Sequence, residues 1–192
     1  MTTLKIVVVV GNTSQRSRTK VLAETIAGAL HAALGARLRA HLEVLEIANL
    51  APHIGTALAP SQLGEEGAEA IRSIEAADLI VAVTPVHKGS YSGLFKHLFD
   101  LVDHEALVGR PVLLAANGGS HRHSLVVDHQ LRPLFAFFRA LAIPSAIYAA
   151  EADYAGYAIE PGPLRDRIDE AVGQAVALLL ARQPAPDLRL SA

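Results

Sequence analysis

The stretch ADLIVAVTPVHKGSYSG, residues 77–93, joins a strand signal to a turn. Its first eight residues form an apolar run of strand length that Pro85 ends, and the residues from Leu94 onward have the apolar spacing of a helix. The glycine-containing segment 85–93 therefore lies at the carboxyl end of a predicted buried strand. Because open α/β sheets bind ligands at such strand ends, this segment is a candidate binding turn.

Strand-length apolar runs and helical patterns alternate along the rest of the chain. Predicted strands cover residues 4–10, 41–47, 78–84, 111–116 and 146–149, and predicted helices cover 17–34, 66–76, 123–141 and 163–181, with another beginning at Leu94. This alternation predicts an α/β fold, a doubly wound five-stranded parallel sheet with helices on both faces. Right-handed crossovers favour the strand order 2-1-3-4-5.

The segment after the second predicted strand is expected to be a long, mostly nonpolar loop, because Pro52, Gly55, Pro60 and Gly64 punctuate it. Its apolar part, residues 50–58, indicates a subunit interface. Residues 1–182 are expected to form a single domain. Residues 183–192, which contain two prolines, are expected to be a flexible tail.

Composition narrows the functional classes. The formal charge of −2 gives no electrostatic reason to expect binding to nucleic acid. The chain has no cysteine, so disulfides, thiolate catalysis and thiolate-bound metals are excluded. The apolar run at residues 4–10 is too short to span a membrane and has no cleavage-site pattern, so a cytoplasmic protein without a membrane partner is expected.

Three glycine-punctuated turns follow predicted strands. The first turn, residues 11–19 (GNTSQRSRT), combines hydroxyl groups, Arg16, Arg18 and the free N–H groups of a helix start, which suit a phosphate bound without a metal. It has neither the spacing of a nucleoside-triphosphate loop nor the dinucleotide fingerprint. The alternative is that Ser17 only caps the helix and both arginines are solvated.

The other two turns favour a planar ligand. The second turn, residues 85–93, offers the backbone N–H groups of Lys88, Gly89 and Ser90 beside the rings of His87 and Tyr91. The third turn, residues 116–120 (ANGGS), has two glycines that allow close approach of a planar ligand to the backbone. All three turns are predicted to converge on one pocket.

With these segments the chain resembles the NADPH-dependent FMN reductase family, in particular the reductases of alkanesulfonate and methanesulfonate utilisation. The resemblance covers about residues 4–182 and rests on Gly11 with 17–19, on 84–96 with Asp100, and on 117–120. Two departures are visible. Asn12 and Ser14 replace the family's Gly-Ser, with arginine coming later at Arg16, and His87 replaces a tyrosine.

The resemblance implies a flavodoxin-like fold with the FMN phosphate on the first turn and the isoalloxazine between the second and third. The implied cofactor-binding residues are Asn12, Ser14, Ser17, Arg18, Thr19, Pro85, Val86, His87, Lys88, Gly89, Tyr91, Asn117, Gly118, Gly119 and Ser120. It also implies NADPH or NADH as the hydride donor, a flavin-dependent monooxygenase of sulfur assimilation as partner, and a homodimer or homotetramer. No catalytic acid or base is expected, because the flavin performs the chemistry.

Two rival functions remain open at the level of sequence. One is an FMN-retaining reductase of quinones, azo dyes or metal oxyanions, and the other is a flavodoxin-type electron carrier. The low net charge and the basic residues Arg16, Arg18 and Lys88 argue against the carrier. His121-x-His123 has no third ligand at a matching spacing, so no metal is expected, and Lys96 with Asp100 is expected to be a supporting ion pair.

Pro133 lies within a predicted helix and lacks an N–H, so a regular helix through it would leave the carbonyl of His129 unpaired. A local i→i+5 bulge relieves this mismatch, and such bulges often mark functional sites. The resemblance implies an inserted aromatic residue here, on a π-helix at the subunit interface, and His129 occupies that position. The alternative is an ordinary proline kink with an exposed histidine.

Overall fold

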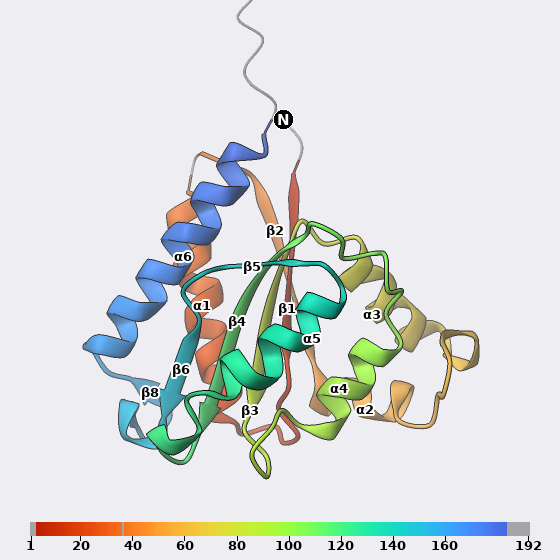
Figure 1. The fold of residues 1–192 in the computed structure, drawn as a ribbon, viewed down its shortest axis with the longest axis horizontal. Helices are drawn as coiled ribbons and strands as arrows, with labels where there is room; N and C mark the ends of the chain where they lie inside the picture. The colour runs from red at the N-terminus through yellow and green to blue at the C-terminus, as the bar shows by residue number, and fades with distance from the viewer. Residues whose placement is uncertain (1–2, 36, 184–192) are drawn as a thin grey trace, which may run out of the picture.

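A computed structural model describes residues 3–35 and 37–183 (Figure 1). Its strands are β1 (Leu4–Val10), β2 (Ala40–Glu46), β3 (Leu79–Pro85), β4 (Pro111–Gly118), β5 (Leu141–Ala142) and β6 (Ile147–Ala150). The strands are ordered β2-β1-β3-β4-β5, and the paired strands are parallel. The predicted doubly wound sheet with order 2-1-3-4-5 is therefore confirmed.

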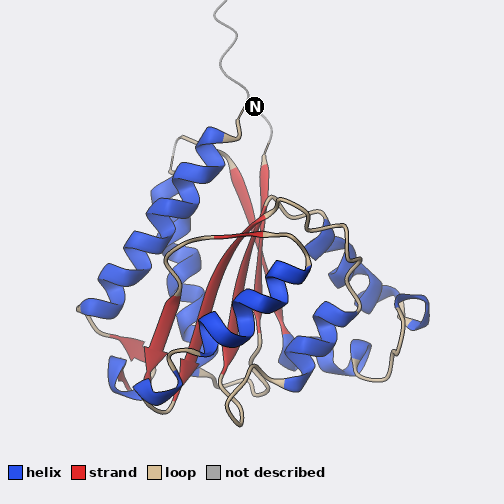
Figure 2. Ribbon diagram, viewed as in Figure 1, coloured by secondary structure: helices blue, strands red, loops and turns tan. Residues whose placement is uncertain are grey.

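Helices cover both faces of this sheet (Figure 2). They are α1 (Arg18–Leu34), α2 (Ile47–Ile54), α3 (Glu65–Glu75), α4 (Gly93–Asp100), α5 (Arg132–Phe137) and α6 (Pro163–Ala181). Short 3₁₀ turns cover Pro60–Gln62, His121–His123 and Glu151–Asp153, a π-helix covers Val127–Leu131, and strands β7 (Tyr154–Ala155) and β8 (Ala158–Ile159) form a small hairpin.

Two apolar cores lie on opposite faces of the sheet, because successive strand residues point to opposite sides. From β1, Ile6 and Val8 pack in the core formed with α1 and α6, whereas Val7 and Val9 pack in the core formed with α2 to α5. All four side chains are fully buried. The uninterrupted β-branched run of β1 is thus explained by a central strand that is covered on both sides.

The fifth strand differs from the prediction because it is divided in two. β5 pairs with the beginning of β4 and β6 pairs with its end. Pro144 lies between them and cannot donate a ladder hydrogen bond. The next N–H, that of Ser145, donates to Oε1 of Gln174 at 2.9 Å instead of to β4. The expected strand at 146–149 therefore corresponds to β6 alone.

Two other expected segments were wrong. The loop expected around residues 50–58 begins with α2, in which Ile47 and Ile54 are fully buried although Pro52 lies inside the helix. Ile54 and Ala57 are buried in the core, whereas Leu58 is 86% exposed, so a subunit interface at residues 50–58 stays a prediction.

The helix expected over 123–141 is much shorter. A 3₁₀ turn and the π-helix at Val127–Leu131 occupy its first part, so regular α-helix is found in α5. The helix ends there because Arg139 adopts a left-handed conformation with φ 55° and Ala140 N–H donates back to Phe135 O at 3.1 Å.

None of the helices in the described ranges has the length and apolar character needed to cross a membrane. Of the tail expected at 183–192, all but Gln183 lies outside the described residues.

Candidate functional site

The first, second and third turns meet at the carboxyl edge of the sheet, at the lower side of Figure 1. Ser92, which is 1% exposed, connects the first two turns: its Oγ donates to Gly11 O at 3.2 Å, and its N–H donates to Oγ1 of Thr84 at 3.3 Å. The second and third turns are joined by the hydrogen bond from Val86 N to Asn117 O at 2.8 Å. These linking roles of Ser92 and Thr84 were not predicted. The signal in the sequence was a hydroxyl residue at each end of the second glycine turn.

The first turn presents unpaired backbone donors. The N–H groups of residues 13–18 donate to no residue within the described chain, and they surround the start of the 17-residue helix α1. Ser17 caps this helix, since its Oγ accepts from Thr19 N at 3.1 Å. The cap interpretation of Ser17 is therefore correct, but it leaves the N–H groups available. Such an array attracts an anion.

Asn12 and Ser14 shape the first turn from within. The Asn12 side chain is buried, and its Nδ2 donates to Ser14 O and to Oε2 of Glu46, both at 3.0 Å. Ser14 Oγ donates to Arg16 O at 3.0 Å. Thr19 is also buried, beneath the turn. Of the predicted residues here, the arginines and the backbone N–H groups are thus the ones that reach outward.

The segment from Glu151 to Tyr157 contacts both arginines of the first turn. The Arg16 guanidinium lies 4.2 Å from the ring centroid of Tyr157. Arg18 Nη1 lies 2.8 Å from Oε1 of Glu151, and its Nε donates to Gly156 O at 3.2 Å. The alternative of solvated arginines therefore fails for Arg18, which is hydrogen-bonded, whereas Arg16 stacks on Tyr157 and remains exposed. The acidic and aromatic residues that directly follow β6 were the signal in the sequence that could have identified this segment.

The second turn is a tight hairpin. His87 N donates to Ser90 O at 2.8 Å and Ser90 N donates back to His87 O at 3.2 Å. Lys88 and Gly89 therefore adopt left-handed conformations, with φ 54° and 87°. The expectation that Ser90 offers a free N–H was wrong, whereas the N–H groups of Lys88 and Gly89 donate to no described residue.

Each glycine of the third turn has a different environment. Asn117 and Gly118 still belong to β4, so the turn proper begins later than expected. A Cβ on Gly118 would lie 2.5 Å from Oη of Tyr148, whereas a Cβ on Gly119 would have no neighbour within 4 Å. Oδ1 of Asn117 is buried without a hydrogen-bond partner among the described residues. The turn therefore combines an open face with an unpaired acceptor.

Comparison with known proteins identifies the family. The sequence model for NADPH-dependent FMN reductase matches residues 4–155. The chain belongs to this family. It is therefore an NAD(P)H-dependent FMN reductase, an oxidoreductase whose ligands are FMN and NAD(P)H.

Relatives align with the reductase over nearly its whole length. An NADH-dependent FMN reductase, SfnF, of Pseudomonas fluorescens is 47% identical over 91% of this chain and 91% of its own length. An FMN reductase (NADPH) of Pseudomonas aeruginosa is 47% identical over 93% and 94%, respectively. A solved oxidoreductase from Corynebacterium diphtheriae is 34% identical, with a TM-score of 0.84, and covers 94% of this chain and 99% of its own. An archaeal flavodoxin, 9% identical with a TM-score of 0.57 over 92% of this chain and 96% of its own, confirms the flavodoxin-like fold.

The residues of the reductase fit FMN at both ends of that molecule. The unpaired N–H groups of residues 13–18 match a phosphate. The unpaired Oδ1 of Asn117 can accept from the N–H of the isoalloxazine pyrimidine, and the open face at Gly119 leaves room for the ring. When bound, FMN supplies the hydride-accepting ring, while the protein binds and orients it.

The expected π-helix is present in the reductase. Arg132 N–H donates to Val127 O, five residues earlier, and Pro133 follows directly. A second link was not expected: Ser90 Oγ donates to Oε1 of Gln130 at 3.0 Å and joins the π-helix to the second turn. The ordinary proline kink is therefore excluded.

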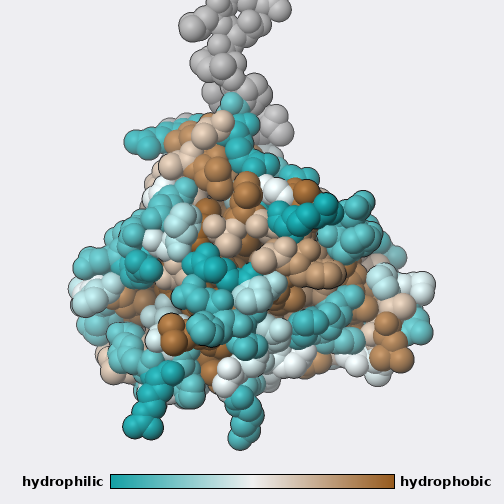
Figure 3. All heavy atoms as spheres, viewed as in Figure 1, coloured by the Kyte–Doolittle hydropathy of each residue, from teal (hydrophilic) through white to brown (hydrophobic). Residues whose placement is uncertain are grey.

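His129 is exposed and lines a groove of about 620 Å³ between α4 and α5. Tyr91 lies in the same groove wall, packed on Phe95 with ring centroids 6.1 Å apart, rather than at the open face of the third turn. Phe137, also in the wall, is 69% exposed. Hydrophobic surface gathers over the α5 and β5 region in Figure 3. The expected supporting ion pair of Lys96 and Asp100 is present at the edge of this groove.

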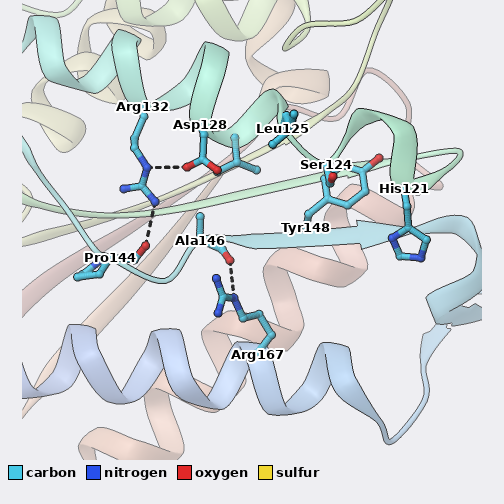
Figure 4. Close-up of a pocket in the computed structure, with 10 residues that line it drawn as sticks. His121, Ser124, Leu125, Asp128, Arg132, Pro144, Ala146, Tyr148 and Arg167 are labelled. Atoms are coloured by element: carbon cyan, nitrogen blue, oxygen red, sulfur yellow. Dashed lines mark hydrogen bonds and ion pairs between the residues drawn. The ribbon is translucent and has the colours of Figure 1, made fainter.

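A separate pocket of about 370 Å³ lies behind the third turn, between the π-helix, β6 and α6 (Figure 4). Arg132 and Arg167 lie in its wall, but they donate to the carbonyls of Pro144 and Ala146, both at 2.9 Å. None of the predicted cofactor-binding residues lines this pocket. Tyr148, whose pKa is raised by burial and by the nearby charge of Asp153, stands between the pocket and the third turn.

Proposed function

We propose that this reductase reduces FMN with NAD(P)H and releases it to a separate flavin-dependent monooxygenase that takes sulfur from sulfonates. The SfnF and SfnE relatives are named NADH-dependent FMN reductases. The sequence resemblance to the reductases of sulfonate utilisation supports the sulfonate part of the proposal. A cytoplasmic location fits this role, because pyridine nucleotides are supplied there.

The observation that carries the proposal is the array of unpaired N–H groups at residues 13–18, placed at the same sheet edge as the open face of Gly119. The phosphate would be held by these N–H groups, with Ser17 and Arg18 beside them. The isoalloxazine would lie between Gly119 with Asn117 on one side and the N–H groups of Lys88 and Gly89 on the other.

Solvent exposure of the site favours exchange of FMN over permanent retention. His87, Lys88 and Gly89 are exposed, and so are residues 13–16 of the first turn. A ligand held mainly by exposed backbone donors dissociates more readily than one enclosed in a core. We also propose a homodimer or homotetramer, with the groove at His129 in its interface.

The deciding experiment measures NADPH and NADH oxidation by the purified chain across a titration with FMN. We expect the rate to saturate with added FMN and the protein to be isolated largely without bound flavin. Stoichiometric flavin in the purified protein, with a rate independent of added FMN, would support the FMN-retaining reductase instead. No oxidation of either nucleotide at any FMN concentration would support the electron carrier.

Arg18→Ala is expected to weaken FMN binding by about 1.5–3 kcal/mol, the range for a charge-assisted hydrogen bond. Riboflavin lacks the phosphate, so its binding is expected to change much less. Titration of flavin fluorescence measures both affinities. Arg72→Ala on α3 is the matched control, because Arg72 also forms surface ion pairs, with Glu65 and Glu69. Equal losses for FMN and riboflavin would contradict the phosphate assignment.

A further inference from the structure

Tyr148 on β6 lies directly against the third turn. Its Oη donates to Ser120 O at 2.7 Å, and the same oxygen occupies the space that a Cβ on Gly118 would need, 2.5 Å away. Figure 4 shows the Tyr148 ring extending from β6 toward the segment that carries Ser124 and His121. One hydroxyl therefore both holds the turn and prevents any side chain at position 118.

The third turn has few other anchors. Within the described chain, the carbonyl of Ser120 is the one backbone group of Gly119 and Ser120 that makes hydrogen bonds, with Tyr148 Oη and with His123 N at 3.3 Å. The bond from Tyr148 is the shorter of the two. Gly119, where the flavin ring would lie, is thus held on one side by Gly118, which pairs with Ala150 in the sheet, and on the other by the Tyr148 hydroxyl through Ser120.

We propose that Tyr148 is a positioning residue for flavin binding, which sets the third turn at the distance the isoalloxazine requires. The proposal rests on the placement of FMN under the proposed function. Burial and the charge of Asp153 raise the pKa of the Tyr148 hydroxyl, which favours its protonated, hydrogen-bond-donating form. The 370 Å³ pocket on the other side of the ring gives Tyr148 space to tilt. What keeps the Tyr148 hydroxyl in place is its hydrogen bond to Ser120 O, together with the space left by the missing side chain of Gly118.

This arrangement predicts that substitutions at Gly118 and Tyr148, which are 30 positions apart, have non-additive effects on FMN affinity. Tyr148→Phe removes the bond to Ser120 and is expected to weaken FMN binding about 3- to 10-fold, the effect of one neutral hydrogen bond. Gly118→Ala is expected to weaken it about 10-fold or more, because the methyl group forces Oη into the pocket and breaks the same bond. In the Tyr148→Phe background the obstructing oxygen is gone. Gly118→Ala is then expected to cost about 3-fold or less, from the Val86 contacts at 3.3 and 3.4 Å.

The experiment measures FMN affinity by fluorescence titration, KM for FMN, kcat and the thermal midpoint for the wild type, both single variants and the double variant. A positioning role raises KM for FMN while kcat at saturating FMN stays within about 2-fold of the wild type. Gly173→Ala on α6 is the control for a glycine substitution, because a Cβ there meets no atom within 4 Å.

Losses that multiply in the double variant would overturn the coupling. An FMN affinity of Tyr148→Phe within about 2-fold of the wild type would overturn the positioning role, even if the thermal midpoint falls. Failure of the proposed function has a different signature, because the wild type would then retain stoichiometric flavin with a rate independent of added FMN, or would oxidise neither nucleotide. Failure of the FMN placement would instead show as normal FMN binding by Gly119→Val.

Discussion

Gly119→Val is expected to produce a folded reductase that no longer binds flavin. Gly119 is exposed, and a Cβ there would have open space for at least 4 Å, so the protein itself accepts a side chain. Its φ lies outside the left-handed region, so valine introduces no backbone strain. The branched side chain would instead occupy the volume of the isoalloxazine.

The measurement is a titration of FMN and riboflavin, with circular dichroism to confirm folding. Both flavins are expected to lose binding, because the valine obstructs the ring rather than the phosphate. Gly64→Val is the matched control: Gly64 is exposed, has extended backbone at φ −73°, and its Cβ would meet no atom within 4 Å. Normal FMN affinity in Gly119→Val would place the ring elsewhere.

Deletion of His129 is expected to leave a folded chain that turns over free FMN poorly. Removal of one residue from the π-helix lets the segment return to i→i+4 pairing up to Pro133, and the bulge itself costs stability. Packing on either side is preserved, because Val127 and Leu131 stay buried on one face. The groove at His129 and the contact between Gln130 and Ser90 are both altered.

Sedimentation velocity and FMN-dependent NADPH oxidation test the deletion together. We expect a changed oligomeric state or changed flavin retention, together with a loss of turnover. His129→Tyr is expected to be much milder, because it keeps the chain length, an aromatic ring and a polar tip. If the deletion leaves assembly and turnover unchanged, the π-helix is only part of the scaffold.

Local patterns were sufficient wherever one segment decides its own structure. The β-branched run of β1 and the apolar run of β3 predicted central strands, because only a strand covered on both faces is apolar at successive positions. Residues of both strands do pack in both cores. Pro133 predicted the π-helix, since a missing N–H acts within one turn. The glycine turns likewise indicated where a flavin would be bound.

The mistakes arose where distant packing outweighs a local signal. Pro52 argued for a loop, but burial of Ile47 and Ile54 stabilises α2 around it. Arg139 ends α5 in a left-handed conformation that is uncommon for a residue with a Cβ, so no sequence signal marked that end.

The sequence alone therefore determined the sheet, its order and the three turns, since these depend on hydrophobic period, glycine and proline, and the motifs in those turns carried the resemblance to the family. Only the tertiary structure decided how the turns are built. It placed Glu151 on Arg18 and Tyr148 under Gly118, across separations of 133 and 30 residues. Such contacts depend on how β6 and its following segment pack beside β4, and no local preference of either residue encodes that distance.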